Sequence, residues 1–202
     1  MTQTSLLLWS GRFLIFGGIL LVSGLNLSPG YSNDAAHFND PLYFPSAVLQ
    51  IAGALMILMA LPLLYAFQAD KGGFFGFLGF LLSFIGLAFF GFAIFFNSFV
   101  MLNIDSLGPE TQALLNTENH PFSSLSNYIT GSLISLSIGF LLLGISGLRS
   151  KGYPNAVPML FIIGAVSTAI LPIYPYNFQI GLSLLCLGII LGGNYIIGEA
   201  KT

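Results

Sequence analysis

The chain has 202 residues, of which 55% are hydrophobic and only 6% are charged. Soluble domains carry about 25% charged residues, and a mean hydropathy of +0.90 excludes a water-exposed surface over most of the chain. The formal net charge of −2 provides no basic face for nucleic acid, so nucleic-acid binding is excluded as well.

Long apolar stretches account for nearly all of the sequence. They cover residues 6–26, 44–67, 74–101, 127–148, 154–174 and 177–198. Each stretch has about 20 residues or more, which is the length a helix needs to cross the hydrocarbon core of a bilayer. The sequence therefore predicts an all-α, polytopic transmembrane helical bundle with six spans, folded as one domain over residues 1–202 and surrounded by lipid.

Turn-forming residues separate these stretches. Ser28-Pro29-Gly30 ends the first stretch, and Asp40-Pro41 precedes the second. Asp70-Lys71-Gly72-Gly73 predicts a tight turn between the second and third stretches. The longer connections, residues 27–43 and 102–126, then lie together on the other side of the membrane.

The basic residues predict the orientation. They are Arg12, Lys71, Arg149, Lys151 and Lys201. With six spans, all five fall on one side, and Lys and Arg in short connections favour the cytoplasmic side. Both termini are therefore expected to be cytoplasmic, and the two longer loops, which contain acidic residues but no Lys or Arg, are expected to be outside.

The outer loops contain the only grouping of residues typical of a metal site. Asp34-x-x-His37-x-x-Asp40 lies in the first loop, and Glu118-x-His120 lies in the second. Imidazole and carboxylate groups are ligands for zinc and copper. The same residues also fit a solvated loop, so the metal site stays a hypothesis.

The apolar stretches contain few side chains that could bind a polar ligand or catalyse a reaction. Buried ionisable groups are the usual sign of function at membrane depth, and Arg12, near a helix end, is the only one inside the apolar stretches. The amides Gln50, Asn97 and Asn194 either bridge neighbouring helices or, in a transporter, line a central cavity. The one cysteine, Cys186, excludes an intrachain disulfide.

Glycines indicate close helix contacts. Gly72-x-x-x-Gly76, followed by Gly79, and Gly188-x-x-x-Gly192 match the small-residue spacing that brings membrane helices together. Eleven phenylalanines between residues 74 and 99 are expected to face lipid. The glycines fit packing within one chain and also fit an interface with a second copy or a partner.

A weak internal similarity relates the two halves of the chain. Pro45-Ser46-Ala47-Val48 and the later Gly53 resemble Pro154-Asn155-Ala156-Val157 and the later Gly164. Two three-helix halves are necessarily inverted relative to each other, as in many transporters. The similarity therefore predicts a weak 3+3 inverted repeat.

Residues 40–86 carry a family resemblance. Their motifs are Asp40-Pro41-x-Tyr43-x-Pro45, Leu61-Pro62-x-x-Tyr65-x-x-Gln68 and Gly76-x-x-Gly79-Phe80-x-Leu82. This segment resembles small six-helix bacterial integral membrane proteins of unknown function. The resemblance implies a prokaryotic cytoplasmic (inner) membrane and supplies no catalytic residues or cofactor.

The expected function is non-enzymatic, because the sequence has no paired nucleophile and base and no nucleotide motif. The leading hypothesis is a structural or accessory subunit that contacts other membrane protein subunits or a lipophilic ligand. The alternative is a small transporter or a lipophilic-ligand-binding membrane protein. An enzyme would have to act from the outer loops.

Overall fold

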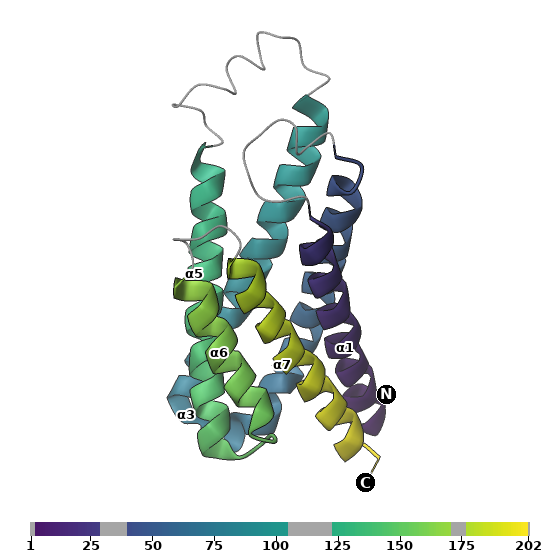
Figure 1. The fold of residues 1–202 in the computed structure, drawn as a ribbon. Coiled ribbons are helices and arrows are strands. Elements are labelled where there is room, and N and C mark those ends of the chain that lie inside the picture. The colour runs from purple at the N-terminus through teal and green to yellow at the C-terminus, as the bar shows by residue number, and fades with distance from the viewer. Residues whose placement is uncertain (1–2, 29–39, 105–122, 171–176, 202) are drawn as a thin grey trace.

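The fold is an all-helical bundle. The structure, a computed structural model, describes residues 3–28, 40–104, 123–170 and 177–201 (Figure 1). Its helices are α1 (Gln3–Leu27), α3 (Tyr43–Ile104), α5 (Ser123–Ser150), α6 (Ala156–Ile170) and α7 (Asn177–Glu199). Because α3 reverses direction at one residue, the described part contains six helical segments, and five are long and apolar enough to cross a membrane. The sixth, α6, has 15 described residues.

The reversal of α3 occurs at Gly73. This residue has φ 56° and ψ −159°, a backbone conformation that is open to glycine because it has no Cβ. We call residues 43–72 the first arm of α3 and residues 74–104 the second arm. The arms run back along each other, and the Tyr65 and Phe80 rings stack between them with centroids 5.1 Å apart. The turn predicted over 70–73 is confirmed, although only Gly73 leaves the helical conformation.

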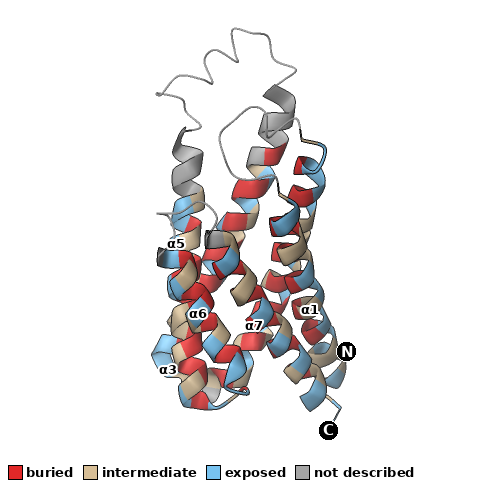
Figure 2. Cartoon of the chain, viewed as in Figure 1, coloured by how far each residue is buried: buried red, intermediate tan, exposed pale blue. Residues whose placement is uncertain are grey.

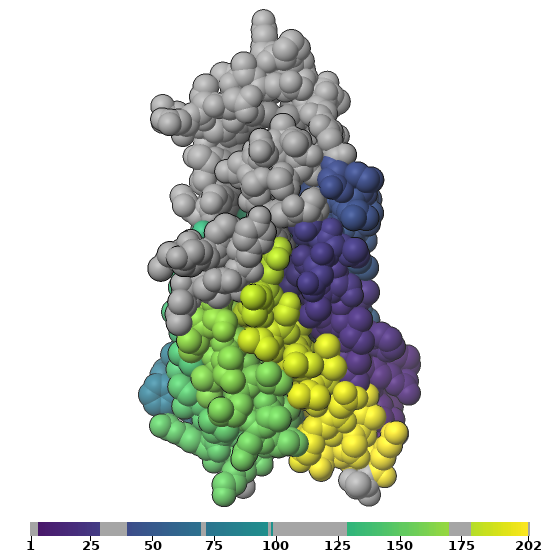
Figure 3. Space-filling view, viewed as in Figure 1, coloured from purple at the N-terminus to yellow at the C-terminus, as the bar shows by residue number. Residues whose placement is uncertain are grey.

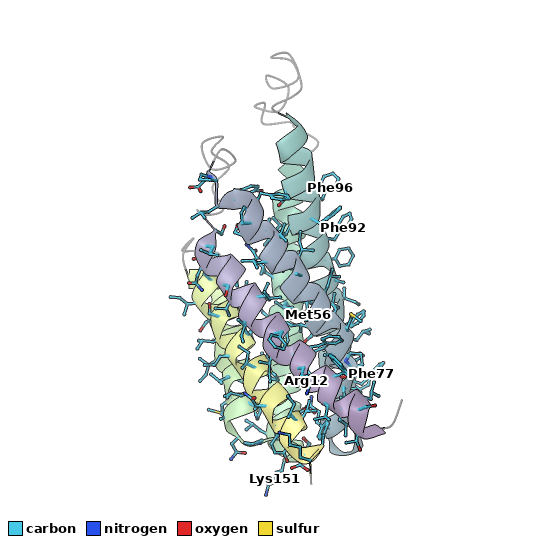
Figure 4. The ribbon with its side chains drawn as sticks, turned by 90° about the vertical axis from the view of Figure 1, so that its right-hand side faces the viewer. Arg12, Met56, Phe77, Phe92, Phe96 and Lys151 are labelled. Carbon is cyan, nitrogen blue, oxygen red and sulfur yellow. The ribbon has the colours of Figure 1, made fainter. Side chains whose placement is uncertain are left out.

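The helices contact one another in chain order and close into a ring. α1 packs against the first arm of α3, the second arm packs against α5, and α5, α6 and α7 follow in turn. α7 packs against α1, which closes the ring. Both chain termini lie at one end of the bundle, together with the α3 reversal and the α5–α6 connection (Figure 1). Arg12 and Lys151 both lie towards that end (Figure 4).

Small residues spaced seven apart line the contact between the second arm of α3 and α5. A Cβ atom placed on Gly79 would lie 2.9 Å from the carbonyl oxygen of Gly139. Seven residues further along the arm, a Cβ on Gly86 would lie 2.6 Å from the backbone nitrogen of Leu136 and 3.0 Å from the Ser132 oxygen. A seven-residue repeat keeps such contacts aligned along two helices that wind around each other with a left-handed twist.

The first arm and α1 approach each other in the same way. A Cβ on Gly17 would lie 3.0 Å from the Gly53 oxygen, and one on Gly24 would lie 2.7 Å from the Ser46 oxygen. Gly17 and Gly24 are again seven residues apart, as are Ser46 and Gly53. Backbone contact between helices therefore recurs around the ring.

The interior is filled by large side chains, and the outer surface is apolar. Phe90 and Phe140 are almost completely buried, as are Leu61 and Leu64. Figure 2 shows buried residues along the inward sides of the helices and exposed residues on the outside. The exposed large side chains are themselves mostly apolar, which is the pattern expected where helices face lipid.

The residues that indicated an inverted repeat have different neighbours. Gly53 of the first arm meets Gly17 and Leu21 of α1, whereas Gly164 of α6 meets Gly181 and Leu185 of α7. A 3+3 repeat would place Gly164 against α5, because α5 corresponds to α1. These contacts do not support the repeat.

Candidate functional site

The predicted metal ligands fall almost entirely outside the described residues. Asp34, His37, Glu118 and His120 lie there, so their arrangement stays a prediction. Asp40 is described, and it has a local role at the start of α3. Its Oδ1 accepts a hydrogen bond from the Leu42 N–H at 2.8 Å, and its carbonyl oxygen accepts one from the Tyr43 N–H at 3.0 Å. No group of three or more His, Cys, Asp or Glu that could hold a metal occurs among the described residues.

Three of the five predicted packing glycines face α5. Cβ atoms placed on Gly72 and Gly76 would each lie 2.6 Å from Ser146 Oγ, and the Ser146 hydroxyl donates a hydrogen bond to the Gly72 oxygen at 3.2 Å. Gly79 lies against Gly139. All three therefore meet a neighbouring helix of the same chain.

The other two glycines are on α7. A Cβ on Gly188 would lie 2.8 Å from the Phe161 ring of α6, and one on Gly192 would lie 3.0 Å from Leu64 of α3. Gly139 of α5 was not among the predicted packing glycines, although its contact with Ser83 is equally close. The prediction rested on glycines four residues apart and on those of the 74–101 stretch, and the seven-residue spacing of Ser132, Gly139 and Ser146 would have identified it.

The polar amides do not gather in a central cavity. Gln50 is buried, and its Nε2 donates to the Gly24 oxygen at 3.2 Å, so it bridges the first arm of α3 to α1. Asn194 is exposed on α7, and the side chain of Asn97 lies outside the described residues. The predicted cavity near these amides therefore has no support from Gln50 or Asn194.

An aromatic cluster fixes the α5–α6 connection. The Tyr153 hydroxyl donates to the Leu64 oxygen, and its ring lies 5.9 Å from the Phe67 ring and 5.6 Å from the Tyr195 ring, measured between centroids. Burial raises the pKa of the Tyr153 phenol well above its ordinary value, so the hydroxyl stays protonated and remains a donor. The cluster joins this connection to the first arm of α3 and to α7, at the end of the bundle that carries both termini and Lys151, which we call the basic end.

An open groove of about 490 Å³ lies between α1 and α7. Its lining is mostly apolar, but four uncharged polar residues occur at one end. These are Ser23 and Asn26, in the last two turns of α1, and Gln179 and Ser183, in the first two turns of α7. Figure 3 shows α1 and α7 meeting on the viewed face of the molecule. The volume is within the range of about 300–1,000 Å³ that is typical of small-molecule sites.

A second surface feature is the aromatic face of the second arm of α3. We use this name for its exposed phenylalanines, which are Phe74, Phe75, Phe77, Phe84, Phe89, Phe92 and Phe95. Figure 4 shows Phe92 projecting from the second arm, away from the neighbouring helices. The glycines on the opposite side of the same arm face α5, so the prediction that the phenylalanines face outward is confirmed for these seven residues. It is wrong for Phe90, which is buried in the core.

Comparison of the chain with protein-family models, with curated proteins and with solved structures gives no match.

Proposed function

We propose that this chain is a non-enzymatic integral membrane protein that serves as a structural or accessory subunit of a membrane assembly. The observation that carries the proposal is the aromatic face of the second arm. Phe74 and Phe92 are 71% and 62% exposed, and five more phenylalanines share the arm. Aromatic side chains are enriched at protein interfaces because they bury a large area with little loss of side-chain freedom.

Photo-crosslinking from single positions tests this proposal. A photoreactive amino acid at Phe92 is compared with one at Met59, which is 69% exposed on the first arm of α3. We expect a discrete protein adduct of fixed mass from position 92 in native membranes and lipid adducts alone from position 59. A monodisperse monomer without a copurifying protein, together with lipid adducts at both positions, would contradict an accessory role.

The proposed threading has six spans with both termini in the cytoplasm of a prokaryotic inner membrane. In this proposal the shorter helix α6 crosses the membrane in addition to the five long helical segments, and it is the fifth span in chain order. α5 ends beside the start of α6 at the basic end, and α7 runs back towards that end, which supports counting α6 as a span. Clustering of the five basic residues at the end with both termini supports a cytoplasmic location for that end. The prokaryotic membrane is proposed from the resemblance of residues 40–86 alone.

Single-cysteine labelling in intact cells tests the threading. After Cys186→Ser, a cysteine replacing Asn116 should react with a membrane-impermeant reagent. A cysteine replacing Asn155, an exposed residue at the basic end, should react only after the membrane is opened. The reverse pattern would place the basic end outside the cell.

The alternative functions differ in what the interior must contain. A transporter of polar solutes needs a cavity inside the ring, whereas Gln50 is used in helix packing and the described core is filled. A lipophilic-ligand-binding protein needs only a site at the edge of the bundle, and the groove between α1 and α7 favours this second candidate. An enzyme acting through a metal in the outer loops would contain bound zinc or copper, and a His37→Ala/His120→Ala variant would lose it.

A further inference from the structure

We propose that the groove between α1 and α7 holds one acyl chain of a membrane glycerolipid, with the glycerol-ester region of that lipid at the polar end of the groove. This site is additional to the accessory role, because it lies on α1 and α7 and uses no residue of the aromatic face.

The position of the groove selects the class of ligand. Both helices that line it are long and apolar enough to cross a membrane, and the groove is open on the outer surface of the bundle. A ligand therefore enters the groove laterally from the bilayer, where the acyl chains of lipids are the most abundant groups. The groove runs from Ile19 to Asn26 on α1, about 10 Å at 1.5 Å per residue, which accommodates part of one chain.

The polar end selects the part of the lipid that binds there. Ser23 and Ser183 have hydroxyl groups that can donate to an ester carbonyl, and Gln179 adds an amide. The Asn26 amide donates one hydrogen to the Val22 oxygen at 2.8 Å, which leaves its second N–H as a donor for an ester carbonyl. Leu187 and Ile190 line the groove further along α7, towards the middle of the bundle, where the aliphatic chain would lie.

The absence of charged residues from the groove lining argues against recognition of a lipid through its phosphate headgroup. None of the residues that line the groove is Lys, Arg, Asp or Glu. A phosphate group is usually bound by Arg or Lys, which supply charge-assisted hydrogen bonds. The groove should therefore hold glycerolipids through the ester region and the chain, with no preference between zwitterionic and anionic headgroups.

The helix contacts supply a matched control surface. Gly18 lies against the Cys186 oxygen, and Gly17 lies against the Gly53 oxygen, so Leu187 on α7 and Leu55 on α3 are at comparable depth. Leu187 is 44% exposed and lines the groove, whereas Leu55 is 56% exposed and does not. Tryptophan at Leu187 fills the groove, and tryptophan at Leu55 adds the same bulk elsewhere.

The test measures the lipid that the 202-residue chain retains. The protein is reconstituted in vesicles of equal parts phosphatidylcholine and phosphatidylglycerol, extracted in mild detergent, washed, and weighed by native mass spectrometry. We expect about one glycerolipid per chain, with both headgroups represented equally. Leu187→Trp should lower the retained lipid at least fivefold, whereas Leu55→Trp should leave it unchanged.

A second variant separates the polar end from the groove itself. Ser23→Ala/Ser183→Ala keeps the groove open but removes both hydroxyls, and it should lower lipid retention at least threefold. No retained lipid in the wild type, equal retention in the two tryptophan variants, or a strong preference for phosphatidylglycerol would each overturn the proposal. A protein bound in the groove, seen as a crosslink from a photoreactive residue at Leu187 in native membranes, would overturn it as well. Crosslinking from Phe92 reports on the accessory role alone.

Discussion

Replacing Gly86 by alanine should push α3 and α5 apart. The added Cβ would lie 2.6 Å from the backbone nitrogen of Leu136, which is 0.8 Å closer than the 3.4 Å at which ordinary contact begins. The Leu136 Cα, at 2.9 Å, and the Ser132 oxygen, at 3.0 Å, are also backbone atoms, so no side-chain rotation relieves the clash. The two helices must therefore separate, and their contacts on either side loosen.

The expected magnitude combines two opposing terms. Overpacking a well-filled interior costs about 1–3 kcal/mol, and a clash with backbone atoms belongs at the upper end of that range. Alanine regains about 1 kcal/mol of helix propensity relative to glycine. The free energy of unfolding should therefore fall by about 1–2 kcal/mol. Gly91→Ala on the same arm meets only the Ala54 Cβ, at 3.5 Å, so it should be neutral or slightly stabilising.

The chain contains its own reporter for this measurement. Cys186 is the one cysteine and is only 1% exposed, so a thiol-reactive dye gains access when the bundle opens. At about 2–4 °C per kcal/mol for a chain of this size, Gly86→Ala should lower the Tm in detergent by about 2–8 °C. Equal Tm values for Gly86→Ala and Gly91→Ala would refute the close backbone contact between α3 and α5.

Three further changes follow from single contacts in the structure. Gln50→Leu removes the hydrogen bond to the Gly24 oxygen. It should lower the free energy of unfolding in the dye assay by about 1 kcal/mol, which is within the range for hydrogen bonds between membrane helices. Asn194→Leu, on the exposed side of α7, is the control and should leave the free energy of unfolding unchanged. Tyr153→Phe should cost about 1 kcal/mol at pH 8. Because burial raises the folded-state pKa of Tyr153 above the unfolded value of about 10, its stabilising effect is complete below pH 10 and is lost at higher pH; the wild type should therefore lose more stability than Tyr153→Phe between pH 8 and 11. Gly73→Ala should lower stability by about 1–3 kcal/mol through backbone strain alone, because no atom lies within 4 Å of the added Cβ; an unchanged Tm would show that the reversal of α3 does not need this conformation.

Much of the fold could be predicted because hydropathy and turn residues act locally. The stretch predicted over 6–26 is observed as α1, and that predicted over 177–198 as α7, with ends that differ by at most three residues. The reversal before residue 74 was signalled by paired glycines. The stretch predicted over 154–174 is observed as α6 over Ala156–Ile170, and the residues at its predicted end lie outside the described part.

Helix contacts could be predicted only in part. Gly76 and Gly79 were found from local spacing, but their partners on α5 depend on which helices are neighbours, and a single sequence does not state this. Gln50 and Asn194 illustrate the same limit, since both are amides in apolar stretches. One is buried against α1 and the other is exposed, because α1 covers one side of the first arm and nothing described covers that side of α7.

The groove could not be predicted, because it depends on two helices whose residues are about 160 positions apart in the chain. Ser23 and Ser183 are ordinary serines in apolar stretches. Only the antiparallel contact of α1 with α7, fixed where Gly11 meets Gly193, brings them to the same end of the bundle. The metal hypothesis is a different case, since four of its five residues lie outside the described part.

The separation of small residues inside from phenylalanines outside has a consequence for protein engineering. The closest helix contacts are made by glycine and serine backbones and by a filled core, whereas most of the aromatic face is exposed, with Phe77 also contacting the Tyr65 ring of the first arm. Exposed residues outside the aromatic face, such as Leu55 and Met59, can therefore be exchanged for glutamate, lysine or glutamine without changing a backbone contact between helices. A redesign confined to such positions would convert the bundle into a water-soluble protein with the same interior, provided that helical charge pairs replace the surrounding lipid as the outer layer.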